Sequence, residues 1–122
     1  MKLRYFSGLL IISVALSLCA PHGNGLEAAG KITLYFFYGK TCPACKKLEP
    51  EVDRLAKRYG VAVKKYEVWH NLKNRDKLLK MLDKLNKNTR EYHGVPLIIL
   101  GNEVMKGGNA SAVEALIRRN QR

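Results

Sequence analysis

The pattern of hydrophobic and polar residues divides the chain into an apolar leader followed by alternating strands and helices. Residues 32–38 (ITLYFFY) are almost continuously apolar, β-branched or aromatic, which predicts a strand buried on both faces. Apolar residues then recur every three or four positions from Cys45 to Tyr59. This spacing predicts a helix with one apolar stripe, and Gly60 has the place of a C-terminal cap.

Shorter elements continue the alternation to the end of the chain. They are, in order, a strand over 61–69, a helix over about 72–85, strands over 97–100 and 103–106, and a last helix that ends at about 119. Lys64 and Lys65 in the middle of the second strand indicate that it is less covered than the first. Ser111 and Glu114 have the spacing of a capping box, which predicts where the last helix begins.

The order of these elements predicts an α/β fold. The first two strands need a right-handed parallel crossover, and the last two form an antiparallel hairpin. A mixed four-stranded sheet flanked by helices on both faces follows from this order. The length of 122 residues allows one domain, which we place at residues 29–122.

Residues 1–25 have the features of an export signal. Lys2 and Arg4 form a positive head, residues 5–20 are largely apolar, and residues 21–25 are polar and turn-forming. We therefore expect a signal peptide or an uncleaved N-terminal anchor with a short linker, and an extracytoplasmic location that is periplasmic, secreted or membrane-anchored. Lipidation at Cys19 is an alternative, although Leu18 before it is larger than such signals normally have.

The net charge of +12 arises from 22 basic and 10 acidic residues, and it concentrates in the second predicted helix and its loop, over residues 73–90. A solvated helix face explains this charge without a partner, and attraction to an anionic membrane surface is the alternative. We expect no nucleic-acid partner, because no aromatic-studded motif accompanies the lysines. We expect the protein to be a monomer.

The candidate reactive residues are Cys42-Pro43-Ala44-Cys45, at the junction between the first predicted strand and the first predicted helix. The two-residue spacer allows both sulfurs to close a small ring, so a reversible disulfide forms with little movement of the backbone. Cys42 falls at the helix N-terminus, where free N–H groups stabilise a thiolate, whereas Cys45 lies on the apolar stripe. This asymmetry predicts that Cys42 reacts with the substrate and that Cys45 resolves the mixed disulfide. Pro43 fixes the first helical turn, and Lys40 adds positive potential.

Two other interpretations of the cysteine pair remain open at this point. One is a structural disulfide, although such bridges rarely span only two residues at the start of a helix. The other is a zinc or copper site, but zinc needs four ligands, and His70 and His93 are distant in sequence. We expect no resident metal.

Residues 38–50 (YGKTCPACKKLEP) resemble the active-site segment of the thioredoxin superfamily, including a helix proline at Pro50. Residues 94–96 (GVP), just before a buried strand, resemble the cis-proline loop of that superfamily. The resemblance implies a thioredoxin-like fold with Val95 and Pro96 as substrate-binding residues beside the disulfide. It also implies that protein thiols and disulfides are the partners, together with a redox partner, and that no organic cofactor is needed.

The sequence departs from the superfamily pattern at several positions. Thr41 stands where thioredoxins carry a Trp, and Phe36 stands where they carry a buried acid. Ala44 replaces the histidine that DsbA-type oxidases often place in the spacer. Residues 107–109 (GGN) resemble the double glycine with which glutaredoxins hold glutathione, so a glutathione site is an alternative.

We therefore expect an exported thiol–disulfide oxidoreductase that exchanges disulfides with protein substrates through Cys42, with Cys45 as the resolving residue and residues 40–44 supporting the site. The first alternative is a glutaredoxin-like, glutathione-dependent reductase. The second is a metal-handling or membrane-surface binding module whose thiols do not turn over.

Overall fold

The computed structural model describes residues 32–122. The predictions for the leader, for Cys19 and for the domain start at residue 29 therefore lie outside the described residues. Within the part of the chain described, no helix is both long enough and apolar enough to cross a membrane.

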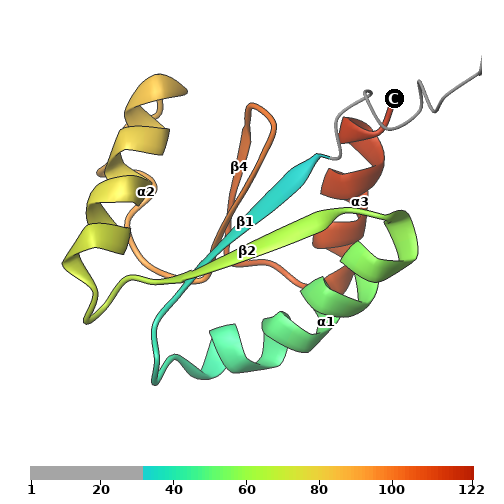
Figure 1. Ribbon diagram of the computed structural model, residues 1–122, viewed down its shortest axis with the longest axis horizontal. Helices are drawn as coiled ribbons and strands as arrows, with labels where there is room; N and C mark the ends of the chain where they lie inside the picture. Colours follow the sequence, from blue (N-terminus) through green and yellow to red (C-terminus); the bar gives the residue numbers. More distant parts are fainter. Residues whose placement is uncertain (1–31) are drawn as a thin grey trace, which may run out of the picture.

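Seven elements follow one another in the predicted order (Figure 1). They are β1 (Thr33–Tyr38), α1 (Pro43–Tyr59), β2 (Ala62–Glu67), α2 (Leu72–Lys84), β3 (Leu97–Leu100), β4 (Glu103–Lys106) and α3 (Ala110–Asn120). The prediction is confirmed for every element, with differences of one or two residues at the ends. Gly60 caps α1 in the left-handed conformation with φ of 67°, which a residue without Cβ adopts at low cost.

The sheet has the strand order β2-β1-β3-β4, so β1 and β3 are central and β2 and β4 are edges. β1 runs parallel to β2 and antiparallel to β3, and β3 and β4 form an antiparallel hairpin. The mixed four-stranded sheet is therefore confirmed. Lys64 and Lys65 lie on the outer strand β2 and are exposed, which agrees with the prediction that this strand is less covered.

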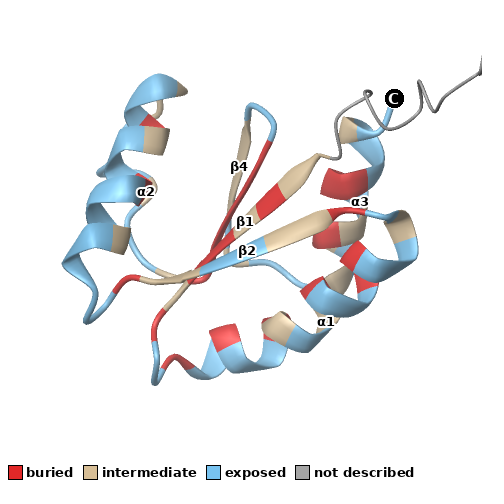
Figure 2. Cartoon of the chain, viewed as in Figure 1, coloured by how far each residue is buried: buried red, intermediate tan, exposed pale blue. Residues whose placement is uncertain are grey.

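The helices cover the two faces of the sheet unequally (Figure 1). α1 and α3 lie together on one face, where the core includes Leu34, Phe36 and Ile117. α2 lies alone on the other face and contributes Leu78 and Leu82 to a smaller core. Figure 2 accordingly shows buried positions along the central strands and a largely exposed α2.

The start of α3 differs from the prediction. Asn109 is its N-cap, and its Oδ1 accepts a hydrogen bond of 3.0 Å from the backbone N–H of Ala112. Ser111 already lies in the first helical turn, so the predicted Ser111–Glu114 capping box is wrong. The helix begins earlier because Asn109 follows Gly107 and Gly108, whose positive φ values of 67° and 104° turn the chain into the helix.

Candidate active site

Cys42 and Cys45 form a disulfide at the N-terminus of α1. Cys42 is the N-cap residue, and its Sγ accepts a hydrogen bond of 3.1 Å from the backbone N–H of Cys45. Pro43 occupies the first helical turn, where its missing N–H costs no hydrogen bond. Both sulfur-bearing residues are buried, with 4% of Cys42 and 1% of Cys45 exposed. The reactive pair therefore lies at a helix N-terminus, with Cys42 as the outer member.

A tight turn leads from β1 to this disulfide. The backbone N–H of Cys42 donates a hydrogen bond of 3.0 Å to the carbonyl oxygen of Gly39. Lys40 and Thr41 are exposed on this turn, and Ala44 is exposed in the spacer. The structure thus places these supporting residues around the disulfide, and their influence on its reactivity stays a prediction.

The Val95–Pro96 peptide bond is cis and lies next to the disulfide. The carbonyl oxygen of Val95 is 4.0 Å from Sγ of Cys42, although 53 positions separate the two residues in the sequence. The carbonyl oxygen of Pro96 accepts a hydrogen bond of 2.8 Å from the backbone N–H of Gly107. The cysteine motif and the GVP segment therefore lie side by side, as the resemblance to the thioredoxin superfamily implies.

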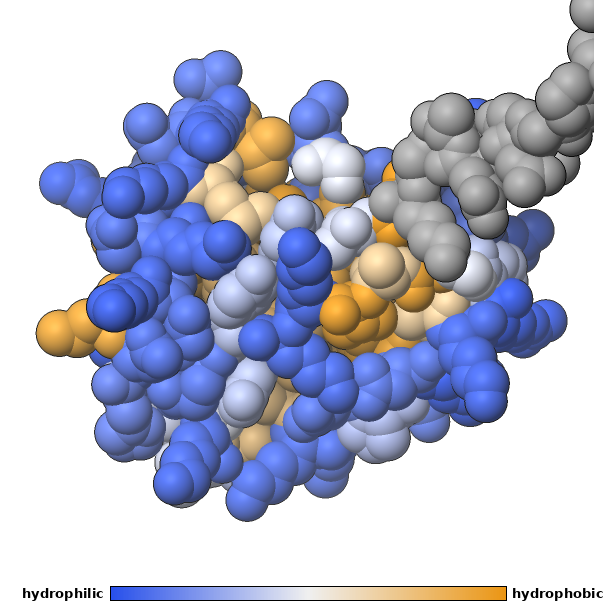
Figure 3. All heavy atoms as spheres, in the orientation of Figure 1, coloured by the Kyte–Doolittle hydropathy of each residue, from blue (hydrophilic) through white to orange (hydrophobic). Residues whose placement is uncertain are grey.

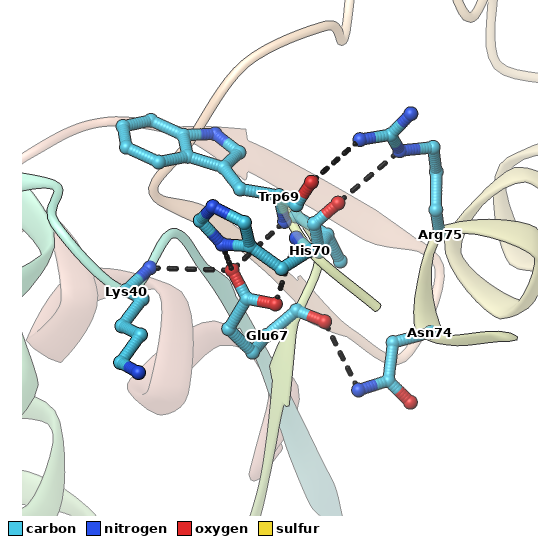
Figure 4. Close-up of polar contacts among 7 residues, drawn as sticks. Lys40, Glu67, Trp69, His70, Asn74 and Arg75 are labelled. Atoms are coloured by element: carbon cyan, nitrogen blue, oxygen red, sulfur yellow. Dashed lines mark hydrogen bonds and ion pairs between the residues drawn. The ribbon is translucent and has the colours of Figure 1, made fainter. Parts of the chain in front are cut away.

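Glu67, at the end of β2, is a site residue that the sequence analysis missed (Figure 4). Its carboxylate accepts backbone hydrogen bonds from Lys40 (3.3 Å), Trp69 (2.9 Å) and His70 (3.0 Å). Desolvation by burial raises the pKa of Glu67, but the N–H bonds from His70, Trp69 and Lys40 outweigh it and hold the pKa below its ordinary value. The carboxylate thereby ties the turn before Cys42 to the loop after β2.

Trp69 lies beyond the end of β2, and its indole packs on the turn before the disulfide rather than into the sheet. A Cβ atom added to Gly39 would overlap the indole ring. Arg75 secures the loop, since Nη2 donates to the carbonyl oxygen of Trp69 (3.0 Å) and Nε to that of Val68 (3.1 Å), as Figure 4 shows. The predicted strand over 61–69 is therefore too long at this end, because β2 ends at Glu67, two residues before Trp69.

An apolar groove of about 230 Å³ runs between α2 and the loop that carries the cis-proline. Its lining residues include Val68, Trp69, Leu78, Leu82, Tyr92 and Val95. Val95 contributes both to this groove and, through its carbonyl oxygen, to the surroundings of the Cys42 sulfur. His93 also lines the groove, with Nδ1 against the carbonyl oxygen of Arg90. The groove and the reactive centre therefore share Val95.

The surroundings of Cys45 are apolar. Phe36, at the position where thioredoxins carry an acid, is fully buried in the same core cluster as both cysteines. Among residues 32–122, no polar or charged residue is buried. The structure therefore offers no buried carboxylate near Cys45 within this range.

A second hollow, of about 340 Å³, lies beside the spacer of the cysteine motif. Ala44 and Lys47 line it from α1, and Gly108 and Asn109 line it from the start of α3. The GGN segment therefore lies next to the cysteine motif, although Asn109 uses its side chain to cap α3. No group of three or more His, Cys, Asp or Glu side chains in the described chain is arranged to hold a metal ion.

Comparisons with known proteins place this site in a family. Residues 27–105 match the family model described as TraF: F plasmid transfer operon protein. Thioredoxin 2 of Plasmodium berghei is 42% identical over 40 residues, which are 33% of this chain and only 26% of that protein. The chain thus matches about a quarter of the length of this relative.

Solved structures show the same fold. A mutant thioredoxin from Halobacterium salinarum has a TM-score of 0.56 and 24% identity over 77% of this chain and 78% of its own. Mitochondrial thioredoxin 3 from Saccharomyces cerevisiae, in its oxidised form, has a TM-score of 0.52 and 22% identity over 74% and 79%. A thioredoxin-like fold with a disulfide-bonded CxxC pair supports a thiol–disulfide oxidoreductase. Because the family model spans more than half of the chain, the protein belongs to the TraF family, and its fold is thioredoxin-like.

Proposed function

We propose that the protein exchanges disulfides with protein substrates through a mixed disulfide on Cys42. The observation that carries this proposal is the position of the Cys42 sulfur, which caps a helix and lies 4.0 Å from the Val95 carbonyl oxygen. The N–H of Cys45 that now meets Sγ of Cys42 stabilises negative charge there once the disulfide opens. Cys42 is therefore the attacking or attacked sulfur.

The exchange proceeds in two steps that conserve electrons. In the oxidising direction, a substrate thiolate attacks Sγ of Cys42, the bond to Cys45 breaks, and Cys45 leaves as a thiolate. A second substrate thiolate then attacks the mixed disulfide and displaces Cys42, so the substrate loses two electrons and the protein gains them. In the reducing direction, Cys42 attacks a substrate disulfide, and Cys45 releases the reduced substrate. The relative stability of the two redox states of the protein sets the direction.

The groove beside Val95 supports a polypeptide as the substrate. Its walls are apolar and include Trp69, and the Val95 carbonyl oxygen offers a hydrogen-bond acceptor next to the reacting sulfur. An extended segment with an apolar residue near its cysteine would bury that residue in the groove and bring its sulfur to Cys42. Val95 and Pro96 are accordingly the proposed substrate-binding residues.

The proposed location is outside the cytoplasm. The charged head and apolar stretch of residues 1–25 support export or N-terminal anchoring.

The test uses full-length protein in non-ionic detergent, equilibrated against defined ratios of reduced and oxidised glutathione. We expect the Cys42–Cys45 pair to show a single two-electron transition. We also expect a Cys45→Ser variant to retain a partner protein as a mixed disulfide. In this Cys45→Ser background, the matched control Cys19→Ser leaves the trapping intact, whereas Cys42→Ser abolishes it. The absence of a redox transition, or trapping that survives Cys42→Ser, overturns the proposal.

Glutathione as the electron donor is a second candidate, because the hollow lined by Lys47, Gly108 and Asn109 opens beside Ala44. A lysine and the start of a helix suit the carboxylates of a small peptide. Reduction of a glutathionylated peptide separates the two candidates. If glutathione binds here, Lys47→Gln raises the KM for glutathione severalfold while the exposed Lys57→Gln does not.

A further inference from the structure

A cleft of about 730 Å³ lies on the side of α2 that faces away from the groove at Val95. α2 forms one wall, and the sheet face that carries Tyr35 and Tyr66 forms the floor. The cleft is next to β2, the outermost strand, so no further strand closes it on that side. It is therefore a concave surface open to a partner.

Lysines line the α2 wall in a regular row. Lys73, Lys77, Lys80 and Lys84 follow one another at steps of four, three and four residues, which places them on one face of the helix. The row extends about 16 Å along the helix axis. Of these four lysines, only Lys80 forms an ion pair within residues 32–122, with Asp76 at 2.8 Å. Figure 3 shows hydrophilic side chains over most of this helix. The wall therefore carries uncompensated positive charge.

The floor of the cleft is aromatic. The rings of Tyr35 and Tyr66 are stacked with centroids 6.3 Å apart, and Lys64 is the cross-strand neighbour of Tyr35. The Tyr66 ring also packs against Phe37 at 5.5 Å, and Nζ of Lys77 lies 5.1 Å from its centroid. Because these neighbours already contact the Tyr66 ring, a nucleobase has little free ring surface on which to stack.

We propose that this cleft docks an acidic polypeptide segment in which carboxylates alternate with apolar side chains. The lysine row pairs with the carboxylates, and the partly buried tyrosine floor receives the apolar side chains. A polypeptide fits better than a membrane, because a bilayer surface is flat and the floor lies recessed behind the lysines. The docking needs neither cysteine, so it is independent of the proposed exchange reaction.

The test measures the binding of a fluorescein-labelled peptide of alternating Glu and Leu to the oxidised, full-length protein by fluorescence anisotropy. The variant Lys73→Gln/Lys77→Gln/Lys84→Gln removes three lysines of the row that form no ion pair within residues 32–122 and keeps residues that favour a helix. The matched control Lys57→Gln/Arg118→Gln/Arg122→Gln removes the same charge from exposed positions outside α2. Labelled oligothymidylate and phosphatidylglycerol vesicles are the competing probes.

We expect the α2 variant to bind the peptide about tenfold more weakly, and the control variant to change binding by about twofold or less, since each exposed charge pair contributes modestly. Binding of the wild type should weaken with added salt, and replacing every Glu of the peptide by Gln should abolish it. The proposal is overturned if both variants weaken peptide binding equally, or if the wild type does not bind the peptide at low salt. It is also overturned if only the binding of oligothymidylate or of vesicles depends on the α2 lysines.

Discussion

The contact between Gly39 and Trp69 makes a quantitative prediction about the turn that leads to the disulfide. A Cβ at Gly39 would lie 2.6 Å from Cε3 of the Trp69 ring and closer still to Cδ2 and Cε2. Separations this short force the indole to move. Because 42% of Trp69 is exposed, the ring can shift outward, so we expect Gly39→Ala to destabilise the protein by about 1–2 kcal/mol, the lower part of the range for overpacking.

The same substitution should have the opposite sign once the indole is removed. The φ of Gly39 lies outside the left-handed region, so alanine fits the backbone there. In a Trp69→Ala background, Gly39→Ala then stabilises by about 0.4–1 kcal/mol, because alanine restricts the unfolded chain. The coupling free energy between the two positions is therefore about 2 kcal/mol.

Thermal unfolding followed by far-UV circular dichroism measures this coupling. In a chain of this size, each kcal/mol of change in stability shifts the Tm by about 4 °C. Trp69 is the one Trp in the sequence, so its fluorescence separately reports whether the indole has moved. Gly60→Ala is the control, since it is strained by a φ of 67° and meets no neighbour within 4 Å, and it should cost the same in both backgrounds. If Gly39→Ala has the same effect with and without Trp69, the reasoning about this contact is wrong.

Three further changes test other parts of the structure. Glu67 has a lowered folded pKa, so its stabilising effect is present above the ordinary value of 4.5 and is lost as the pH falls through the folded pKa. The Tm advantage of the wild type over Glu67→Gln should therefore be constant near neutral pH and shrink below about pH 4.5. Asn109→Ala should destabilise by about 1 kcal/mol through loss of the α3 cap, whereas Ser111→Ala should be nearly neutral in urea unfolding. Leu82→Ala, at a side chain that is 1% exposed, should cost about 2–5 kcal/mol in the same assay.

Each of these predictions has an outcome that contradicts it. A Tm difference for Glu67→Gln that does not change with pH would show that the charge of the carboxylate is unimportant. A larger effect of Ser111→Ala than of Asn109→Ala would restore the capping box predicted from sequence. A cost for Leu82→Ala below about 1 kcal/mol would mean that α2 packs too loosely for a cavity to form.

The strands and the reactive cysteines were predictable because they depend on local sequence. The buried strand at 32–38 is a continuous apolar run, the stripe from Cys45 to Tyr59 is a periodic pattern, and the spacing of the two cysteines allows a disulfide within one helical turn. The position of Pro96 beside Cys42 came from the resemblance, since no local pattern links residues this far apart.

The remaining site features were missed because their partners are distant in sequence. Glu67 looks like an ordinary strand residue, and its bond to Lys40 spans 27 positions. Trp69 continues the alternation of the strand before it, and only the early end of β2 frees its ring to reach Gly39. At the start of α3, two residues had suitable cap side chains, and the glycines that select Asn109 act through backbone geometry.

The unequal covering of the sheet has a consequence for the order in which the molecule opens. α2 buries only Leu78 and Leu82, whereas α1 buries five residues against the other face. Amide hydrogens of α2 should therefore exchange with solvent through a local opening that leaves α1, β1 and the disulfide folded. The groove at Val95 and the lysine cleft both use α2 as a wall. A single low-energy fluctuation would thus remove both binding surfaces while the reactive sulfurs stay in place, and any ligand held by either surface should slow exchange throughout this helix.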